Sequence, residues 1–157
     1  MHYREAQPPP ALRHLVKASW TLDAPETRSG RLTHVATPDG CMELIWRLAG
    51  RSEWNGQQPA RFVAGIITRP AELGLSGGSR FVAVRIWPWT WRALTGRSPA
   101  GLTDRWEAMP PGFDRFEDAP RPADPFDLIA PDLLRLRASR VATAGLSARS
   151  VRGKGDG

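Results

Sequence analysis

The sequence predicts a mainly β fold with C-terminal helices, an antiparallel barrel or sandwich of the α+β class. Six short segments within the first 87 residues are rich in β-branched and aromatic residues, which is typical of strands. Gly, Pro, Asn or Asp interrupt the chain between most of these segments and so indicate turns. After Pro88 the apolar spacing changes to that of helices. Several short strands separated by turns favour antiparallel pairing.

A proline run precedes the first of these strands. Pro8, Pro9 and Pro10 fix φ and disfavour helix in the residues before them, so we expect a short helix or arm over residues 11–16. The predicted strands cover residues 16–22, 31–37, 42–48, 61–68, 72–75 and 80–87.

Two further kinds of segment follow the predicted strands. Short helices are expected over residues 89–94 and 98–102, where Ser98 can cap the second helix and Pro99 suits its first position. Residues 110–125 hold two proline-rich stretches and an acidic run, a composition typical of linkers. We therefore expect a β-rich sensory and dimerisation domain over 1–109, a linker loop over 110–125, and a helical segment with a basic tail over 126–157.

Length and composition exclude several classes. A compact chain of 157 residues forms one domain and buries about 70% of its unfolded surface. Its single cysteine, Cys41, excludes an internal disulfide framework and a zinc site built from several cysteines. No apolar run approaches the ~20 residues of a membrane-spanning helix, and the N-terminus lacks signal-peptide features. We expect a cytoplasmic protein that does not contact membranes.

The formal net charge of +6 is concentrated at one end of the chain. Residues 135–157 carry six Lys and Arg against one Asp, whereas the preceding 134 residues carry 16 basic against 15 acidic residues. A DNA-binding surface normally shows as a basic patch spread over the fold. The balanced body therefore predicts that DNA binding by this chain is weak or absent.

A tight turn is predicted at Pro38, Asp39 and Gly40, directly before the strand that begins at Cys41. We expect Gly40 at positive φ and Asp39 bonded to nearby backbone amides, which would set the register of the strand. Cys41 follows the turn, where backbone amides can lower a thiol pKa. A buried structural cysteine is the simpler interpretation, because a nucleophile would also need a neighbouring base.

Several motifs occur in a recognisable order. The segment Thr37–Trp46 contains the PDGC turn, and Tyr3-Arg4-Glu5, Arg69-Pro70, Phe81–Ile86 and Gly101–Arg105 accompany it. Together these resemble, over roughly residues 3–107, the N-terminal sensory domain of AraC-type bacterial transcription regulators, in the subgroup with a PDGC turn. The resemblance implies a cupin-like architecture for the predicted barrel or sandwich, and it implies a regulatory role without naming an effector.

The C-terminal segment is similar to part of a helix-turn-helix of the same regulators. A small-residue helix, a turn at Gly145 and a helix opened by Leu146-Ser147 are expected there, with Arg149 and Arg152 as weak nucleic-acid contacts. Only about a dozen positions of that unit precede Gly157, so we expect the DNA-binding half to be missing or incomplete. A frayed tail is the simpler alternative.

Catalytic patterns are sparse. The histidines are His2, His14 and His34, and none forms a His-x-His pair or another recognisable metal-binding spacing. We therefore predict no metal, no cofactor and no catalytic residue. His34 is expected to be a packed or surface histidine. Glu43 can pair with Arg85 across strands or face solvent, and solvent exposure is the commoner outcome.

Tryptophan is unusually frequent, with seven residues in the chain. Trp87, Trp89 and Trp91 alternate around Pro88, so a strand would place all three on one face, whereas the start of a helix would splay them. We expect Trp46 and at least one of these three to line an apolar cavity for an aromatic or cationic ligand. Packing in the core or in a dimer contact is the alternative.

These observations predict a sensory domain that regulates transcription by binding a small-molecule effector, by dimerising, or both. The partner would be a second copy or, in a mixed dimer, a full-length relative. Two alternatives from other classes stay open: a small metal-dependent cupin enzyme, and a decayed gene product without function.

Overall fold

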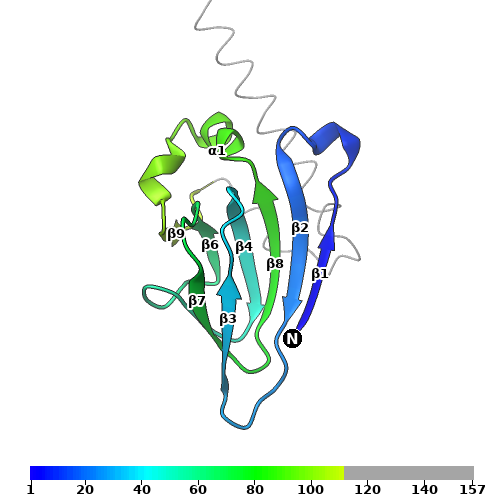
Figure 1. Cartoon of the computed structure of the whole chain (residues 1–157), viewed down its shortest axis with the longest axis vertical. Helices are drawn as coiled ribbons and strands as arrows, with labels where there is room; N and C mark the ends of the chain where they lie inside the picture. Colours follow the sequence, from blue (N-terminus) through cyan, green and yellow to red (C-terminus); the bar gives the residue numbers. More distant parts are fainter. Residues whose placement is uncertain (112–157) are drawn as a thin grey trace, which may run out of the picture.

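The computed structural model describes residues 1–111, and this part of the chain is mainly antiparallel β structure (Figure 1). The strands are β1 (His2–Ala6), β2 (Val16–Asp23), β3 (Arg31–Ala36), β4 (Met42–Ala49), β5 (Ser52–Glu53), β6 (Arg61–Ala64), β7 (Ala71–Ser76), β8 (Arg80–Ile86) and β9 (Trp106–Ala108). The helices are α1 (Pro88–Thr95) and the short 3₁₀ turns η1 (Pro10–Leu12) and η2 (Pro99–Leu102). The predicted linker and helical tail lie outside the described residues.

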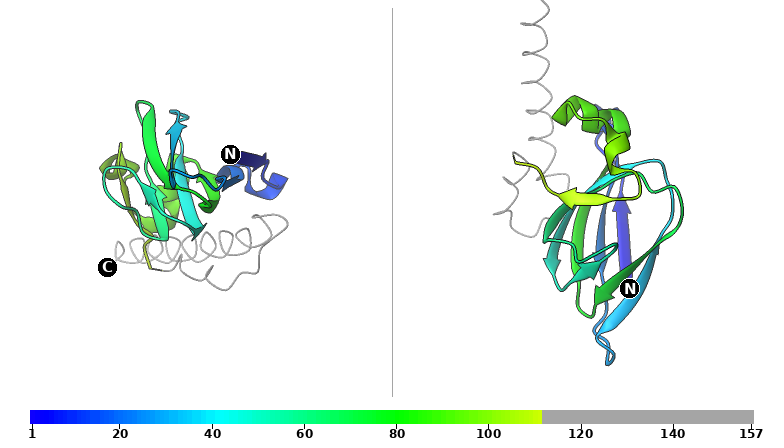
Figure 2. Two further views of the ribbon diagram at one scale, coloured as in Figure 1. Left: turned by 90° about the horizontal axis from the view of Figure 1, so that it is seen from below. Right: turned by 90° about the vertical axis from the view of Figure 1, so that its left-hand side faces the viewer.

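The strands form two sheets. One has six strands in the order β1-β2-β8-β4-β6-β9, and the other has three in the order β3-β7-β5. In Figure 1, β3 and β7 lie in front of β4 and β6, and the right-hand view of Figure 2 shows the layers from the side. The mainly antiparallel prediction is confirmed. The barrel is wrong for the described residues, because β3, β7 and β5 pair only among themselves and neither sheet closes.

The two faces of the six-stranded sheet support two apolar clusters. Successive side chains of a strand point to opposite faces, so Met42, Leu44 and Trp46 share one face and Ile45 lies on the other. The first face packs against apolar residues of η1, α1 and η2. The second packs against the three-stranded sheet through Leu75.

The predicted match between β4 and β8 is confirmed. Their register pairs Met42 with Ile86, Leu44 with Val84 and Trp46 with Val82. The same register places Glu43 directly opposite Arg85. On the opposite face, β4 therefore carries Glu43 beside Ile45, and β8 carries Arg85 beside Ala83.

The segment after β6 departs from the prediction. A strand was expected to reach Thr68 but ends at Ala64, because residues 65–68 bond to the segment beyond η2. The Gly65 amide donates to the Arg105 carbonyl at 2.9 Å, and the Thr68 amide donates to Asp104 Oδ1 at 2.8 Å. A Cβ on Gly65 would lie 1.8 Å from the Leu102 carbonyl oxygen. Glycine therefore allows this close approach.

Helix α1 begins one residue before and ends one residue after the predicted range of 89–94. Trp87 is extended and Pro88 occupies the first turn, while Gly96 ends the helix with φ of 73°, a conformation that glycine adopts readily. Ser98 caps η2 by accepting a hydrogen bond from the Ala100 amide at 3.3 Å.

Candidate functional site

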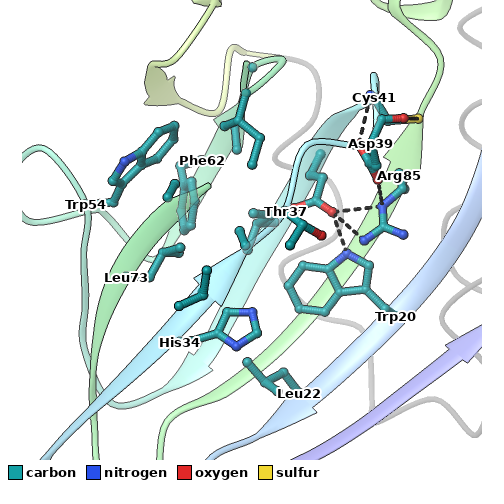
Figure 3. Close-up of a pocket in the computed structure, with 18 of the residues that line it drawn as sticks. Trp20, Leu22, His34, Thr37, Asp39, Cys41, Trp54, Phe62, Leu73 and Arg85 are labelled. Carbon is teal, nitrogen blue, oxygen red and sulfur yellow. Dashed lines mark hydrogen bonds and ion pairs between the residues drawn. The ribbon is translucent and has the colours of Figure 1, made fainter. Parts of the chain in front are cut away.

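A cavity of about 380 Å³ lies between the two sheets. Its walls are largely apolar, and Figure 3 shows side chains that enter it from both layers. The six-stranded sheet contributes Trp20, Leu22, Ile45 and Phe62, and the three-stranded sheet contributes His34 and Leu73. A volume of this size is within the range of small-molecule sites. The cavity is therefore the candidate ligand site of the described domain.

One end of the cavity carries a cluster of charges around Arg85. Arg85 Nε lies 2.8 Å from Asp39 Oδ2 and 3.0 Å from Glu43 Oε1, and Nη2 also lies 3.0 Å from Glu43 Oε1. Nη1 donates to Glu5 Oε2 at 3.1 Å. The indole of Trp20 donates from Nε1 to Glu43 Oε1 at 3.0 Å (Figure 3). One guanidinium thus joins carboxylates from β1, the turn before β4, and β4 itself.

The environment shifts the ionisation of this cluster. Burial raises the pKa of Glu43 above its ordinary value, and the Arg85 charge partly opposes that shift. Burial lowers the pKa of Arg85, but the charges of Glu43 and Asp39 outweigh it and the net shift is upward. Burial and the hydrogen bond to Glu5 raise the pKa of Tyr3 to about 12. The carboxylates therefore favour the charged form of Arg85, and the Arg85 charge favours the ionised form of Glu43 against its burial.

The predicted turn forms the border of the charged end. Gly40 has φ of 73°, and Asp39 Oδ1 accepts from the Cys41 amide at 2.9 Å, as expected for a side chain that caps a tight turn. The other carboxylate oxygen of Asp39 contacts Arg85. The turn thus holds Asp39 in a position where it serves both the backbone and the cluster.

Cys41 is buried, which confirms its structural interpretation. The idea that turn amides lower its pKa is wrong. Burial, together with the negative charge of Asp39, raises the pKa of the thiol to about 11. The thiol therefore stays protonated near neutral pH, which disfavours a nucleophilic role.

Gln58 forms a second polar group at the border of the cavity. Gln58 is 1% exposed, and neither its Oε1 nor its Nε2 has a hydrogen-bond partner among the described residues. Its backbone is fixed, since its amide donates to the Ser52 carbonyl at 3.0 Å and its carbonyl accepts from Arg47 Nη2 at 3.0 Å. The buried Ser52 Oγ also has no partner within this part of the chain. Buried amides and hydroxyls are normally hydrogen-bonded.

The four tryptophans predicted to bind a ligand do not line this cavity. Trp46 and Trp91 are buried together in the apolar cluster on the opposite face of the six-stranded sheet. Pro88 starts a helix rather than continuing a strand, so the three alternating tryptophans do not share one face. Trp91 is buried in the core, whereas the rings of Trp87 and Trp89 stack on each other. Trp89 is 60% exposed while Trp91 is fully buried. Their ligand-binding role stays a prediction, and the cavity itself points to other residues.

Trp87 and Trp89 form a stacked pair on that side of the domain. Their ring centroids are 5.1 Å apart with planes inclined by 8°. Their indoles donate to the backbone carbonyls of Arg13 and His14 at 3.1 and 2.9 Å. The pair therefore fastens the segment after η1 to the start of α1.

His34 is the histidine that lies at the cavity. His34 lines the cavity from β3, and burial lowers its pKa. No group of three or more His, Cys, Asp or Glu side chains within residues 1–111 is arranged to hold a metal ion. Arg149 and Arg152 lie outside the described residues.

Sequence reasoning missed Trp20, Glu5 and Gln58 as site residues. For Trp20 a signal existed, because alternation along 16–22 places it on the same face as Leu22. Glu5 belongs to a strand that was not predicted, and Gln58 belongs to a segment that was predicted as a turn. Glu43 and Arg85 were considered as a pair, and the less common of the two outcomes is the one observed.

Comparison with known proteins identifies the family. Residues 4–107 match the family DUF6597, described as a domain of unknown function, and the chain belongs to this family. No curated protein matches the chain, and no solved structure does. Among the helices of residues 1–111, none is long and apolar enough to cross a membrane.

Proposed function

We propose that this domain binds a small-molecule effector between its two sheets and acts as the sensory domain of an AraC-type transcription regulator with a cupin-like architecture. The observation that carries the proposal is the cavity itself. It combines aromatic and aliphatic walls with a few polar side chains, the composition typical of small-molecule sites. The resemblance of residues 3–107 to AraC-type sensory domains supplies the regulatory role.

The charge cluster offers a route from the cavity to the edge of the domain. Arg85 lines the cavity and contacts Glu5 of β1, and β1 is an edge strand of the six-stranded sheet. A ligand that draws Glu43 or Arg85 toward itself would weaken the contact with Glu5. An effector can shift a dimerisation equilibrium only if it binds the monomer and the dimer with different affinity, and a changed contact at edge strand β1 could supply that difference.

A thermal-shift screen of a small-molecule library against the full chain tests the proposal. Any true ligand raises the free energy of unfolding, by about 2.7 kcal/mol at a hundred times its Kd. Sedimentation with and without each stabilising compound then shows whether binding changes the oligomeric state, as regulation through dimerisation requires.

A matched pair of variants locates the binding site. Leu73 lies on β7 and lines the cavity, whereas its neighbour Glu72 is exposed. Leu73→Trp should fill the cavity and abolish the stabilisation, and Glu72→Trp should leave it intact. A compound that stabilises both variants equally would place its site elsewhere, and a screen without any stabilising compound would contradict the proposal.

A further inference from the structure

The cavity has polar groups at two separated places with apolar walls between them. Glu43, Ile45 and Arg47 follow one another on the same face of β4, and four residues of strand span roughly 13 Å. Glu43 belongs to the charged end. Arg47 donates through Nη2 to the Gln58 carbonyl, so Gln58 belongs to the other end. Ile45 and Phe62 line the cavity between them.

The charged end carries an excess of negative charge. Three carboxylates, those of Glu5, Asp39 and Glu43, face two cations, Arg85 and Lys17. Each nitrogen of the Arg85 guanidinium already contacts a carboxylate. An anionic ligand would therefore add a fourth negative charge without a ready partner, whereas a cation would relieve repulsion among the three.

Glu43 retains an acceptor for such a cation. Its contacts with Trp20 and Arg85 all use Oε1, which leaves Oε2 for a ligand. The indole of Trp20 borders the same end of the cavity (Figure 3). A carboxylate beside an indole suits an organic cation with an aromatic body, because the acid attracts the positive charge and the ring offers an apolar surface to the body.

At the other end of the cavity, the amide of Gln58 lacks hydrogen-bond partners. Gln58 is fully buried, lines the cavity, and has no partner for either side-chain atom within residues 1–111. A buried amide without partners destabilises a fold, because burial removes its hydrogen bonds to water without replacing them. Both amide atoms are covered in this structure, so the side chain would have to turn toward the cavity, where a ligand hydroxyl can donate to its Oε1 and accept from its Nε2 and so remove this penalty.

We propose that the ligand is a small organic cation with an aromatic body, its cationic group at Glu43 and a hydroxyl or similar group at Gln58. This inference rests on the proposed small-molecule site and specifies its chemistry. The aromatic body would lie between Ile45 and Phe62 of one sheet and Leu73 of the other.

Isothermal titration of the full chain with three compounds of one skeleton tests the charge preference. Tyramine, tyrosol and 4-hydroxyphenylacetate share a 4-hydroxyphenyl group and end in an ammonium, an alcohol and a carboxylate. Tyramine should bind at least about tenfold more tightly than the other two, as a charge-assisted hydrogen bond implies. Equal or weaker binding of tyramine, or no binding of any of the three, overturns the inference.

The failure of this inference is separable from that of the proposed function. Tighter binding of tyrosol or 4-hydroxyphenylacetate would overturn the cation preference and leave the small-molecule site standing. Absence of any ligand in the broader thermal-shift screen would remove the site itself.

Two variants test the ends separately. Gln58→Met keeps the volume and removes the amide, so tyramine affinity should fall about tenfold, to that of phenethylamine, which lacks the hydroxyl. The same variant should unfold at no lower urea concentration than the wild type, which a purely structural Gln58 would not allow. Glu43→Gln should reduce tyramine affinity about tenfold and leave tyrosol affinity unchanged. Unchanged tyramine affinity in either variant overturns the assignment of that end.

Discussion

Replacing Arg85 by methionine would remove the only guanidinium that contacts Glu5, Asp39 and Glu43 in the described domain. The side chains of Arg85 and Glu43 are 18% and 23% exposed, so solvent compensates little for the lost charge. Removal of one partner from a buried ion pair costs 3 to 5 kcal/mol. The residual exposure places Arg85→Met near the lower limit, at about 3 kcal/mol of unfolding free energy at pH 8.

The unfolding free energy lost in Arg85→Met should increase with pH. The folded-state pKa of Glu43 is raised above its ordinary value of 4.5, so between those two values the native state binds the extra proton. Stability from this group therefore falls as pH rises through that window. Without the Arg85 charge the folded pKa rises further and the window extends to higher pH. The difference between wild type and Arg85→Met should thus be larger at pH 8 than at pH 5.

Urea unfolding of the full chain at pH 5, 6, 7 and 8, followed by tryptophan fluorescence, measures this difference. Arg31→Met is the matched control, because Arg31 Nη2 lies 3.5 Å from Glu53 Oε2 and both side chains are largely exposed. This variant should lose about 0.5 kcal/mol of unfolding free energy at every pH. The double variant Arg85→Met with Glu43→Gln should recover most of the stability. A pH-independent loss, or a double variant no more stable than Arg85→Met, would refute the reasoning.

The remaining predictions concern the turn, the thiol and the tryptophans. Gly40→Ala should lower the free energy of unfolding by about 1 to 2 kcal/mol, because Gly40 has a positive φ. The control Gly101→Ala should not, because an added Cβ there has no atom within 4 Å and the backbone has no positive φ. Equal urea midpoints for the two variants would contradict the assigned turn. Cys41, with its thiol pKa raised to about 11, should react with iodoacetamide at pH 8 far more slowly in the native chain than in urea, and equal rates by mass spectrometry would contradict its burial. Trp91→Ala should cost roughly 3 to 5 kcal/mol and Trp89→Ala about 1 kcal/mol or less, since only Trp91 is fully buried; a reversed order in urea unfolding would contradict the assigned core.

The parts of the fold that sequence predicts are those encoded by local pattern. Alternating apolar residues located β4 and β8 and identified their shared face, because side-chain direction in a strand has a period of two. Glycine and proline located the turn at Pro38–Cys41, and Pro88 marked the change from strand to helix, because these residues restrict or extend the accessible φ. Such signals need no knowledge of distant contacts.

The parts that escaped prediction depend on distant partners. Strand β1 is polar and exposed for most of its length, and only its register with β2 makes it a strand. Residues 65–68 have strand-like composition, yet their amides bond to Arg105 and Asp104. Tertiary pairing thus outweighs local propensity at both places.

The candidate site was harder to predict than the fold. Glu43 and Arg85 become a pair only through the register of β4 and β8, and the backbone of Gln58 is held by hydrogen bonds to Arg47 and Ser52, which the sequence does not reveal. The tryptophan alternation was visible in the sequence, but Pro88 converts it into the start of a helix. Composition therefore indicated aromatic residues at a site without identifying which face of the sheet would hold it.

The indole N–H resonances of the tryptophans provide the most direct test of ligand binding between the sheets. In ¹⁵N-labelled protein titrated with tyramine, and with each compound that passes the thermal screen, the Trp20 resonance should shift most, since its Nε1 donates to Glu43 within the cavity. The resonances of Trp87 and Trp89, which bond to backbone carbonyls outside the cavity, should stay in place. Shifts at Trp87 and Trp89 with an unmoved Trp20 would contradict the account.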